Sequence, residues 1–318
     1  TPDTALAKEA GLELGIKESI VVNDRMETSV PDIYAAGDAV QVKHYVTGND
    51  ALISLAGPAN KQGRIIADNI CGGDSRYLGS QGSSVIKVFD MTAATTGINE
   101  TNAKKSGLEV DTVILSPMSH AGYYPGGKVM TMKVIFEKES YRLLGAQIIG
   151  YEGVDKRIDV LATAIHAGLN ATQLKDLDLA YAPPYSSAKD PVNMAGFMID
   201  NIAKGTLKQW HLEDMDKISK DKDVVLLDVR TVGEFSRGHI DGFKNIPVDE
   251  LRERISEIEK GKPVYLICQS GLRSYIASRI LEGNGYETYN FSGGFRFYDA
   301  VVNDRALIER AYACGMDY

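Results

Sequence analysis

The sequence predicts a multidomain protein in which α/β and α+β units follow one another. Its 318 residues suffice for two or three domains. From residue 207 to 318, strand and helix patterns alternate, which is typical of a small parallel α/β sheet. From residue 83 to 205, strand patterns come first and helix patterns follow, which indicates an α+β domain. Residues 1–80 form the remaining unit.

Composition excludes several classes of protein. The chain is 44% hydrophobic and 25% charged with a net charge of −8, so no nucleic-acid-binding surface is expected. No apolar run approaches the roughly 20 residues of a membrane span, and no signal peptide is recognised. The three cysteines, Cys71, Cys268 and Cys314, are too few for a disulfide framework and form no CxxC pair, so no metal site is expected. We therefore expect a cytoplasmic protein, and the start at Thr1 without Met predicts a fragment or a processed chain.

The first unit is expected to be small. A short β-branched run predicts a strand at residues 19–22. A helix is expected from about Asn60 to Ile70, with Gly72 ending it. The stretch at residues 79–84 is rich in Gly and Ser and predicts a linker to the second unit.

The second unit begins with expected strands at residues 85–89 and 111–115. Two further strands are expected at residues 129–136 and 142–149. The residues between these two are polar, so the pair is expected to form a hairpin.

Two helices are expected to follow these strands. The first covers residues 154–166, where apolar side chains recur at helical spacing and Gly168 acts as the stop. The second has Asp190 as its N-cap and Pro191 as its first residue. Its apolar face, which includes Ile199, is a candidate surface for a second copy of the chain.

The third unit is expected to alternate strictly between strands and helices. Strands are expected at residues 224–229, 264–267 and 287–291, with helices at residues 248–258 and 274–281. Ligands of such parallel sheets lie beyond the carboxyl ends of the strands. A functional site is therefore expected where the strand at residues 264–267 ends.

A cysteine occupies that position. Cys268 opens a short loop between a strand and a helix, where backbone N–H groups converge and can stabilise a thiolate or another anion. Gly271 allows a tight turn, and Arg273 adds a fixed positive charge. We expect a nucleophilic cysteine that carries sulfur. The loop residues of this cradle are Gln269, Ser270, Gly271 and Leu272.

The third unit resembles the rhodanese family in several motifs that occur in the family's order. These are residues 227–230, 234–247, 268–273 and 293–295. Related phosphatases have five residues between the cysteine and the arginine, whereas four separate Cys268 from Arg273, so the tighter loop favours a single sulfur atom over a phosphate. The resemblance implies that Cys268 attacks a sulfane-sulfur donor and holds a persulfide, stabilised by the N–H groups of the loop.

Four more polar residues of these motifs are expected to support the loop. Asp228, Arg230, Glu234 and His239 carry charges or hydrogen-bonding groups close to the cysteine in the motif order. We interpret them as a structural network behind the loop, because a single histidine near a strand end is weak evidence for catalysis.

A second resemblance lies in residues 28–38, which are similar to the second FAD-binding motif of the pyridine nucleotide–disulfide oxidoreductases. The resemblance implies that Thr28, Gly37 and Asp38 help to bind FAD and that the unit at residues 1–80 is the remnant of an FAD-binding Rossmann-like domain. No GxGxxG occurs in the chain, and Cys71 is interpreted as a packing residue rather than a redox cysteine. The choice between NADH and NADPH therefore stays open.

Two tyrosines indicate which branch of this family the chain resembles. Most members of the family end with a His-Pro pair, which this chain lacks. Tyr123, in Gly-Tyr-Tyr-Pro-Gly-Gly, and Tyr181, in Tyr-Ala-Pro-Pro-Tyr, are similar to the coenzyme A-disulfide reductase branch fused to a rhodanese domain. That branch implies that both phenols donate hydrogen bonds or protons to a departing thiolate. Tyr124 and Tyr185 are alternative members of the pair.

The same resemblance implies further ligands and a partner. Tyr181 is expected near the flavin, and Asn60 and Lys189 are candidates for contacts with coenzyme A. A homodimer through residues 83–205 would bring the tyrosines to the other subunit's cysteine. Three functions remain: reduction of coenzyme A disulfide, persulfide or polysulfide with FAD and NAD(P)H; sulfur transfer alone between small donors and acceptors; or a dimerisation module without catalysis.

Overall fold

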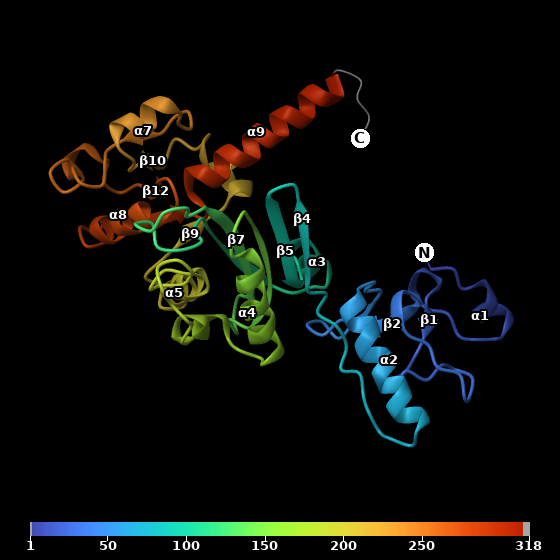
Figure 1. Ribbon diagram of the computed structural model, residues 1–318. Helices are drawn as coiled ribbons and strands as arrows, with labels where there is room; N and C mark the ends of the chain where they lie inside the picture. Colours follow the sequence, from blue (N-terminus) through green and yellow to red (C-terminus); the bar gives the residue numbers. More distant parts are fainter. Residues whose placement is uncertain (1, 314–318) are drawn as a thin grey trace.

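The strands of the computed structural model, which describes residues 2–313, form three sheets (Figure 1). The first sheet has three strands and belongs to residues 20–51, and the second has five antiparallel strands. The third has five parallel strands. The arrangement confirms the predicted order of an α+β unit followed by a parallel α/β unit.

The first unit packs one long helix against a small sheet. Strand β1 pairs in parallel with β2, and β2 pairs antiparallel with β3. Helix α2 starts at Ala56, four residues before the predicted start, because Pro58 is accepted in a first helical turn, where no intrahelical N–H bond is required. Met26, Val40 and Val42 form the buried core of the first unit. The elements are α1 (Ala5–Glu9), β1 (Ile20–Val21), η2 (Gly37–Ala39), β2 (Val40–Lys43), β3 (Asp50–Ala51) and α2 (Ala56–Ile70).

The second sheet has the strand order β4-β5-β8-β7-β6. The predicted hairpin is present, because Lys133 on β7 pairs with Gln147 on β8. Sequence patterns missed β5, which consists mostly of Thr and Ala and lacks large apolar residues. The strands are β4 (Ser84–Val88), β5 (Met91–Gly97), β6 (Val110–Leu115), β7 (Met130–Glu137) and β8 (Leu143–Gly150).

Helices cover this second sheet and complete its core. Helix α4 has the predicted bounds Val154–His166 and packs on β5 and β8. Helix α5 (Pro191–Ala203) begins as predicted, with the Asp190 carboxylate accepting a hydrogen bond from the N–H of Val192 at 3.0 Å. The apolar face of α5 is not free for a second copy, since Ile199 is fully buried in the unit's own core. The short helices of this unit are α3 (Glu100–Lys105) and η3 (Ala171–Asp176).

The third sheet has the order β11-β10-β12-β13-β9, with β12 at its centre. Successive residues of β12 point to opposite faces, because Leu266 packs into one apolar core and Ile267 into another. The predicted parallel pairing is therefore confirmed, with a core on each face. The elements are β9 (Gln209–Trp210), α6 (Met215–Ile218), β10 (Val225–Asp228), α7 (Val232–Arg237), β11 (Lys244–Asn245), β12 (Val264–Ile267), α8 (Leu272–Glu282), β13 (Thr288–Phe291) and α9 (Gly294–Ala313).

The prediction of a helix at residues 248–258 is wrong. This segment forms successive turns and one 3-10 turn at Ile255–Glu257. Its start is fixed to the sheet, because the N–H of Val248 donates to the carbonyl of Val229 at 3.1 Å. Leu251 and Ile258 still reach the core at helical spacing, so tight turns produce the apolar pattern that predicted a helix.

The stretch at residues 79–84 connects the first and second sheets, but it is packed rather than free. The N–H of Tyr45 donates to the carbonyl of Ser80 at 2.9 Å, and the Gln81 amide donates to the carbonyl of Ala162 on α4 at 2.9 Å. The Gly/Ser-rich composition predicted a free linker, but these hydrogen bonds hold the segment against the rest of the fold.

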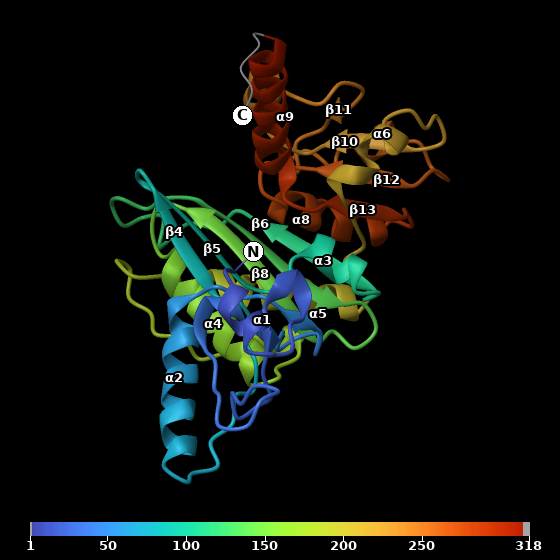
Figure 2. The ribbon, with the colours of Figure 1, turned by 90° about the vertical axis from the view of Figure 1, so that its right-hand side faces the viewer.

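The third unit covers the edge strand of the second sheet, as the turned view shows around β6 (Figure 2). The Gln209 amide donates to the carbonyl of Thr112 at 2.8 Å, and the N–H of Ile114 donates to the hydroxyl of Ser292 at 3.1 Å. His211 Nε2 lies 3.0 Å from a carboxylate oxygen of Asp111. Backbone groups that an exposed edge would leave unpaired are thus used to join the two units.

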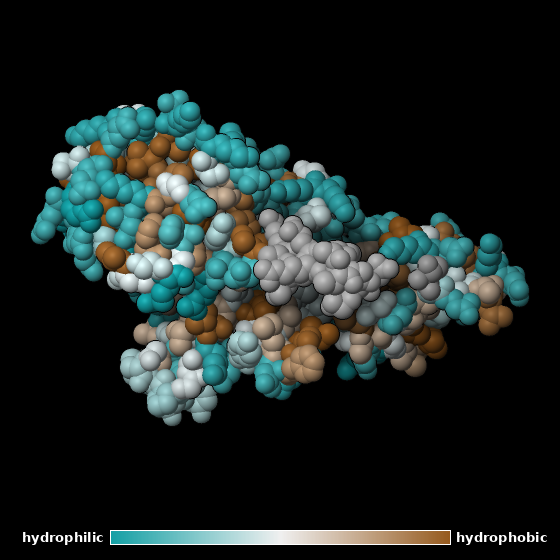
Figure 3. All heavy atoms as spheres, turned by 90° about the horizontal axis from the view of Figure 1, so that it is seen from above, coloured by the Kyte–Doolittle hydropathy of each residue, from teal (hydrophilic) through white to brown (hydrophobic). Residues whose placement is uncertain are grey.

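Large apolar side chains are exposed where β4 and β5 project as a hairpin. Phe89 at its tip is 94% exposed, and Val85, Ile86 and Val88 are more than half exposed. Seen from above, the surface of the molecule shows apolar atoms interspersed with polar ones (Figure 3). Several exposed large apolar side chains in one hairpin are typical of an interaction site. In the part of the chain that the structure describes, no helix is both long and apolar enough for a membrane span.

We expect the contact between His211 and Asp111 to weaken as the pH rises above neutrality. Burial lowers the pKa of His211, but the hydrogen bond and charge of Asp111 outweigh it and leave this pKa raised. The stabilisation is complete below the ordinary histidine pKa of about 6.5 and is lost as the pH rises through the raised value. Calorimetric unfolding between pH 5.5 and 9 should show this loss.

The matched control is Asp111→Asn, which removes the charge but keeps the shape of the side chain. We expect its unfolding temperature to vary less over the same pH range. Identical pH profiles for both proteins would contradict the assignment.

Candidate functional site

Cys268 lies directly after β12, at the carboxyl end of the parallel sheet, and is 1% exposed. Its Sγ accepts a hydrogen bond from the N–H of Gly271 at 3.1 Å and one from the Ser274 hydroxyl at 3.2 Å. Helix α8 begins at Leu272, so its first turn supplies both the geometry and Ser274. Two donors therefore already surround a sulfur atom that becomes more negative as a thiolate.

Two glycines shape the loop around this sulfur. Gly271 has a φ of +101°, which L side chains rarely adopt. Gly294, at the start of α9, approaches the loop so closely that a Cβ would lie 2.7 Å from the backbone nitrogen of Ser270. The N–H of Phe295 donates to the carbonyl of Cys268 at 2.8 Å. The start of α9 therefore holds the cradle from behind.

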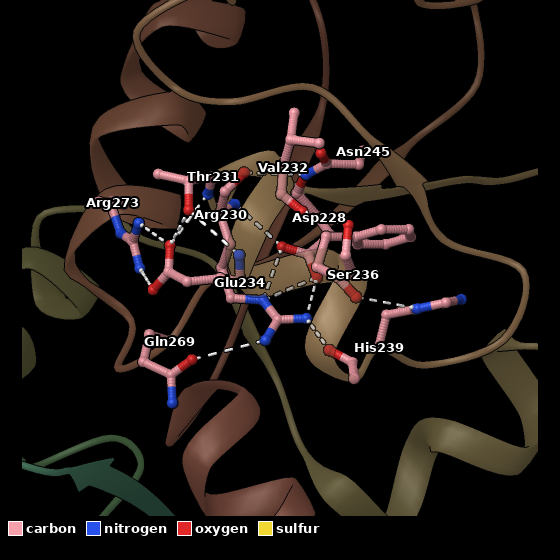
Figure 4. A network of polar contacts seen from close by, with 12 residues as sticks. Asp228, Arg230, Thr231, Val232, Glu234, Ser236, His239, Asn245, Gln269 and Arg273 are labelled. Carbon is pink, nitrogen blue, oxygen red and sulfur yellow. Dashed lines mark hydrogen bonds and ion pairs between the residues drawn. The ribbon is translucent and has the colours of Figure 1, made fainter.

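Arg273 pairs with a carboxylate rather than with the sulfur. Both terminal nitrogens of its guanidinium donate to Glu234 at 2.7 Å (Figure 4). The bidentate hydrogen bond from Arg273 lowers the pKa of Glu234 to about 2. Glu234 also accepts a hydrogen bond from the backbone N–H of Thr231, the N-cap of α7. The predicted fixed charge is present, but it links the loop to α7.

Asp228 and Arg230 form a buried ion pair behind the loop, as predicted (Figure 4). The guanidinium lies 3.8 Å above the ring of Phe295, and one of its nitrogens lies 3.5 Å from the side-chain oxygen of Gln269. His239 lies at the edge of this network, where its Nδ1 is 3.1 Å from the carbonyl oxygen of Phe235 (Figure 4). Its ring stacks on Phe235 within α7 at 4.0 Å, which agrees with a structural role.

The structure brings Tyr123 and Tyr181 together. Their hydroxyl oxygens are 2.7 Å apart, although 58 positions separate them in the sequence. The hydrogen bond between the two hydroxyls raises the pKa of Tyr181. The alternatives point elsewhere: Tyr124 contacts the ring of His120 edge-on, and Tyr185 is exposed. The geometry thus favours the predicted pair as a single unit of two phenols that can supply a proton.

The segment from Thr28 to Asp38 has the features that a polar cofactor group requires. Gly37 has a φ of +83°, and its N–H donates to the side-chain oxygen of Gln62 at 2.7 Å. This bond anchors the turn to α2. Asp38 is exposed at the turn, so its carboxylate is accessible. The exposed carboxylate of Asp38 beside this turn can therefore accept hydrogen bonds from the hydroxyl groups of a flavin nucleotide.

Family models match three parts of the chain. A pyridine nucleotide-disulphide oxidoreductase model matches residues 1–63, and the dimerisation domain of the same group matches residues 83–191. A rhodanese-like domain matches residues 211–300. The chain belongs to the pyridine nucleotide-disulphide oxidoreductases. It carries a rhodanese-like domain after the dimerisation domain.

Curated relatives are similar over about three fifths of the chain. An NAD(P)H sulfur oxidoreductase (CoA-dependent) of Pyrococcus furiosus is 38% identical over 191 residues, which are 60% of this chain and 43% of that protein. A coenzyme A disulfide reductase of Staphylococcus aureus is 36% identical over 197 residues, which are 62% of this chain and 44% of that protein. The chain spans less than half the length of these relatives.

Solved structures extend the similarity to both domains. The reduced Bacillus anthracis protein named CoADR-RHD is 48% identical with a TM-score of 0.93, over 96% of this chain and 55% of that one. An NAD-dependent persulfide reductase from A. fulgidus is 42% identical with a TM-score of 0.86, over 94% of this chain and 54% of that one. The dimerisation and rhodanese-like domains therefore occur together in both proteins.

The two candidates for coenzyme A contacts, Asn60 and Lys189, lie apart from the Cys268 loop. Asn60 is exposed on α2 and uses its amide to bond the carbonyl of Ala56 at 2.9 Å. Lys189 is exposed before α5, with its ammonium 5.8 Å from the ring centre of Phe197. No hydrogen bond within residues 2–313 joins either of them to the rhodanese-like loop. Their contacts with coenzyme A remain predictions, and Cys314 lies outside the described residues.

Sequence reasoning missed three residues that build these sites. Ser274 donates to the sulfur, Gly294 leaves room for the cradle, and Arg157 is buried beneath the tyrosine loops. The pattern contained a signal for Arg157, because it lies on the same helix face as Ile158 and Leu161. Gly294 belongs to a rhodanese-like motif, but the sequence did not indicate the role of Gly294 or Ser274, because both roles depend on contacts between chain segments.

We expect Glu234→Gln to lower the free energy of unfolding by about 1–2 kcal/mol at pH 7. The substitution weakens a charge-assisted pair and changes a capping box at the start of α7. The folded pKa of about 2 lies below the ordinary value of 4.5, so the stabilisation is present above pH 4.5 and is lost as the pH falls toward 2.

Urea unfolding of both proteins between pH 7 and 3 measures this difference. Glu253→Gln is the control, because Glu253 has no ion pair within the described residues. A difference between wild type and Glu234→Gln that stays constant down to pH 3 would contradict the assigned pKa.

Proposed function

We propose that the whole protein reduces coenzyme A disulfide or coenzyme A persulfide with FAD and NAD(P)H, and that its rhodanese-like domain carries sulfur on Cys268. The observation that supports this most is the similarity to CoADR-RHD over 96% of the chain, which includes both domains. The names of the curated relatives support the same class of substrate.

The sulfur step at Cys268 follows from its surroundings. The Cys268 thiolate attacks the outer sulfur of a donor such as thiosulfate, forms a persulfide and releases sulfite. A nucleophilic acceptor then takes the outer sulfur and regenerates the thiolate. The N–H of Gly271 and the hydroxyl of Ser274 offset negative charge on Sγ in the thiolate. The loop N–H groups from Gln269 to Arg273 surround the terminal sulfur.

The tyrosine pair supports the reductive step. A thiolate that leaves a disulfide or a persulfide needs a hydrogen bond or a proton. Tyr181 holds its proton more strongly than an isolated phenol, because Tyr123 bonds to it. The pair therefore acts as a neutral donor at pH 7. In a homodimer through residues 83–205, the exposed pair and the exposed β4–β5 hairpin are available to the second subunit.

Cofactor and substrate contacts are proposed from the family resemblance of these positions. Thr28, Gly37 and Asp38 hold the flavin nucleotide, and Tyr181 borders it. These residues would hold FAD, which would supply two-electron transfer between NAD(P)H and the sulfur chemistry. Asn60 offers a hydrogen-bonding amide to coenzyme A, and Lys189 offers a positive charge to its phosphates.

Cys268→Ala should abolish thiocyanate formation from thiosulfate and cyanide, because no other side chain of the loop supplies a nucleophilic sulfur. The matched control is Cys71→Ala, which removes an exposed cysteine at the end of α2. We expect the control to keep the wild-type rate. Persistence of activity in Cys268→Ala would contradict the sulfur-carrier assignment.

Tyr123→Phe and Tyr181→Phe should each lower kcat for NADH oxidation by the full-length protein about 10²-fold, the lower range for loss of a general acid. Coenzyme A persulfide and coenzyme A disulfide are both assayed. Tyr124→Phe is the control and should retain activity, because Tyr124 packs on His120. Turnover of neither substrate by the wild-type protein would leave only the sulfurtransferase.

A further inference from the structure

A buried arginine lies beneath the two tyrosines. Arg157 belongs to α4 and is 1% exposed, although its helix neighbours on the same face are apolar. Its guanidinium lies between two loops, residues 116–129 and residues 177–190. A fully buried charge is unfavourable unless it is paired and hydrogen-bonded, so the surroundings of this group carry information.

The guanidinium binds both loops at once. One terminal nitrogen donates to the carbonyl of Ser119 at 2.9 Å, in the loop that carries Tyr123. The same nitrogen donates to the Ser186 hydroxyl at 3.1 Å and to Asp190 at 3.0 Å, in the loop that carries Tyr181. Arg157 thus links the two segments that meet again at the paired hydroxyls.

Further contacts make this link rigid. The Ser186 hydroxyl donates to Asp190 at 2.6 Å, and the carboxylate of Asp190 also caps α5. The N–H of Ala121 donates to the carbonyl of Ser186 at 2.9 Å, so the loops bond directly as well. The other terminal nitrogen of Arg157 donates to the carbonyl of Gly153 at 3.1 Å.

The site is shaped for a guanidinium. A Cβ on Gly153 would lie 2.0 Å from Nη1 of Arg157, so only glycine leaves room for this side chain. Lysine cannot replace the contacts, because a single ammonium lacks the planar fork that reaches several acceptors at fixed angles. The chain therefore places an arginine with several partners where an apolar residue would suffice for packing.

We propose that Arg157 is a positioning residue that holds the loops of Tyr123 and Tyr181 so that the two hydroxyls stay paired. The inference rests on the proposed function, because it assigns a task to the pair that donates to the leaving thiolate. Arg157 bonds the carbonyls and side chains around the tyrosines and neither phenol itself. It acts through loop geometry, where displacements of about 1 Å reduce rates about 10²-fold.

The test follows Tyr181 itself. Tyrosines labelled with ¹³C at Cζ are titrated by NMR in the chain and in Arg157→Lys, with Tyr181→Phe identifying the signal. We expect the pKa of Tyr181 to fall toward the ordinary tyrosine value in Arg157→Lys, because the hydrogen bond between the hydroxyls of Tyr123 and Tyr181 loosens. Ser186→Ala, which removes one shared partner and no charge, should shift it in the same direction by less.

The control separates positioning from general stability. Arg230→Lys weakens the other fully buried arginine–aspartate pair, in the rhodanese-like domain, and should leave the titration of Tyr181 unchanged. If Arg157→Lys does not fold, Ser186→Ala decides the question alone. An unchanged Tyr181 titration in the folded variants would overturn the proposal.

Activity of the full-length protein supplies the second readout. Arg157→Lys should lower kcat about 10²-fold, and it should leave the thiocyanate-forming activity at Cys268 unchanged. If the wild-type protein has no reductase activity, the proposed reductase function is refuted. The effect of Arg157 on the pKa of Tyr181 is still tested by the titration. A normal kcat in a variant whose Tyr181 titration has shifted would overturn the positioning role instead.

Discussion

The central place of β12 in the parallel sheet is the constraint on which the sulfur site depends. Because β10 and β13 pair with both edges of β12, its last residue ends at a fixed point beyond the sheet, and Cys268 follows directly. The cores on both faces prevent the strand from rotating or slipping. The loop then needs only Gly271 to turn and the first turn of α8 to supply donors. A reactive sulfur is thus held by strand pairing rather than by its own loop alone.

The ion pairs around the Cys268 loop and at the domain boundary join separate segments of the chain. Arg273 links the sulfur loop to α7 through Glu234, and Arg230 supports the loop from below through Asp228. His211 and Asp111 join the rhodanese-like domain to the edge of the dimerisation domain. Gln209 of β9 and Ser292, directly after β13, also bond to β6, so these contacts together fix where Cys268 lies relative to the second sheet. The position of Cys268 relative to the dimerisation domain therefore depends on contacts far from the cysteine.

Strong local patterns predicted the regular elements, and non-local contacts decided the rest. Helix α4 was predicted residue for residue, since its apolar spacing and Gly168 define both ends. Strand β5 escaped notice, because Thr and Ala form a strand here through pairing on both sides rather than through their own apolarity. The turns at residues 248–258 imitate a helix, because burial of Leu251 and Ile258 needs the spacing but not the backbone. Periodicity reports which residues are buried and leaves the backbone conformation undecided.

The sequence by itself determined the two kinds of domain, the sulfur loop with Cys268, and the tyrosines as a pair. These features depend on short contiguous motifs, whose residues carry their chemistry wherever the fold places them. Only the tertiary structure decided that the hydroxyls of Tyr123 and Tyr181 are 2.7 Å apart, that Arg273 binds Glu234, and that Arg157 joins both tyrosine loops. Each of these contacts joins residues separated by about 30 to 60 positions, and the distance between such residues is set by the packing of whole elements.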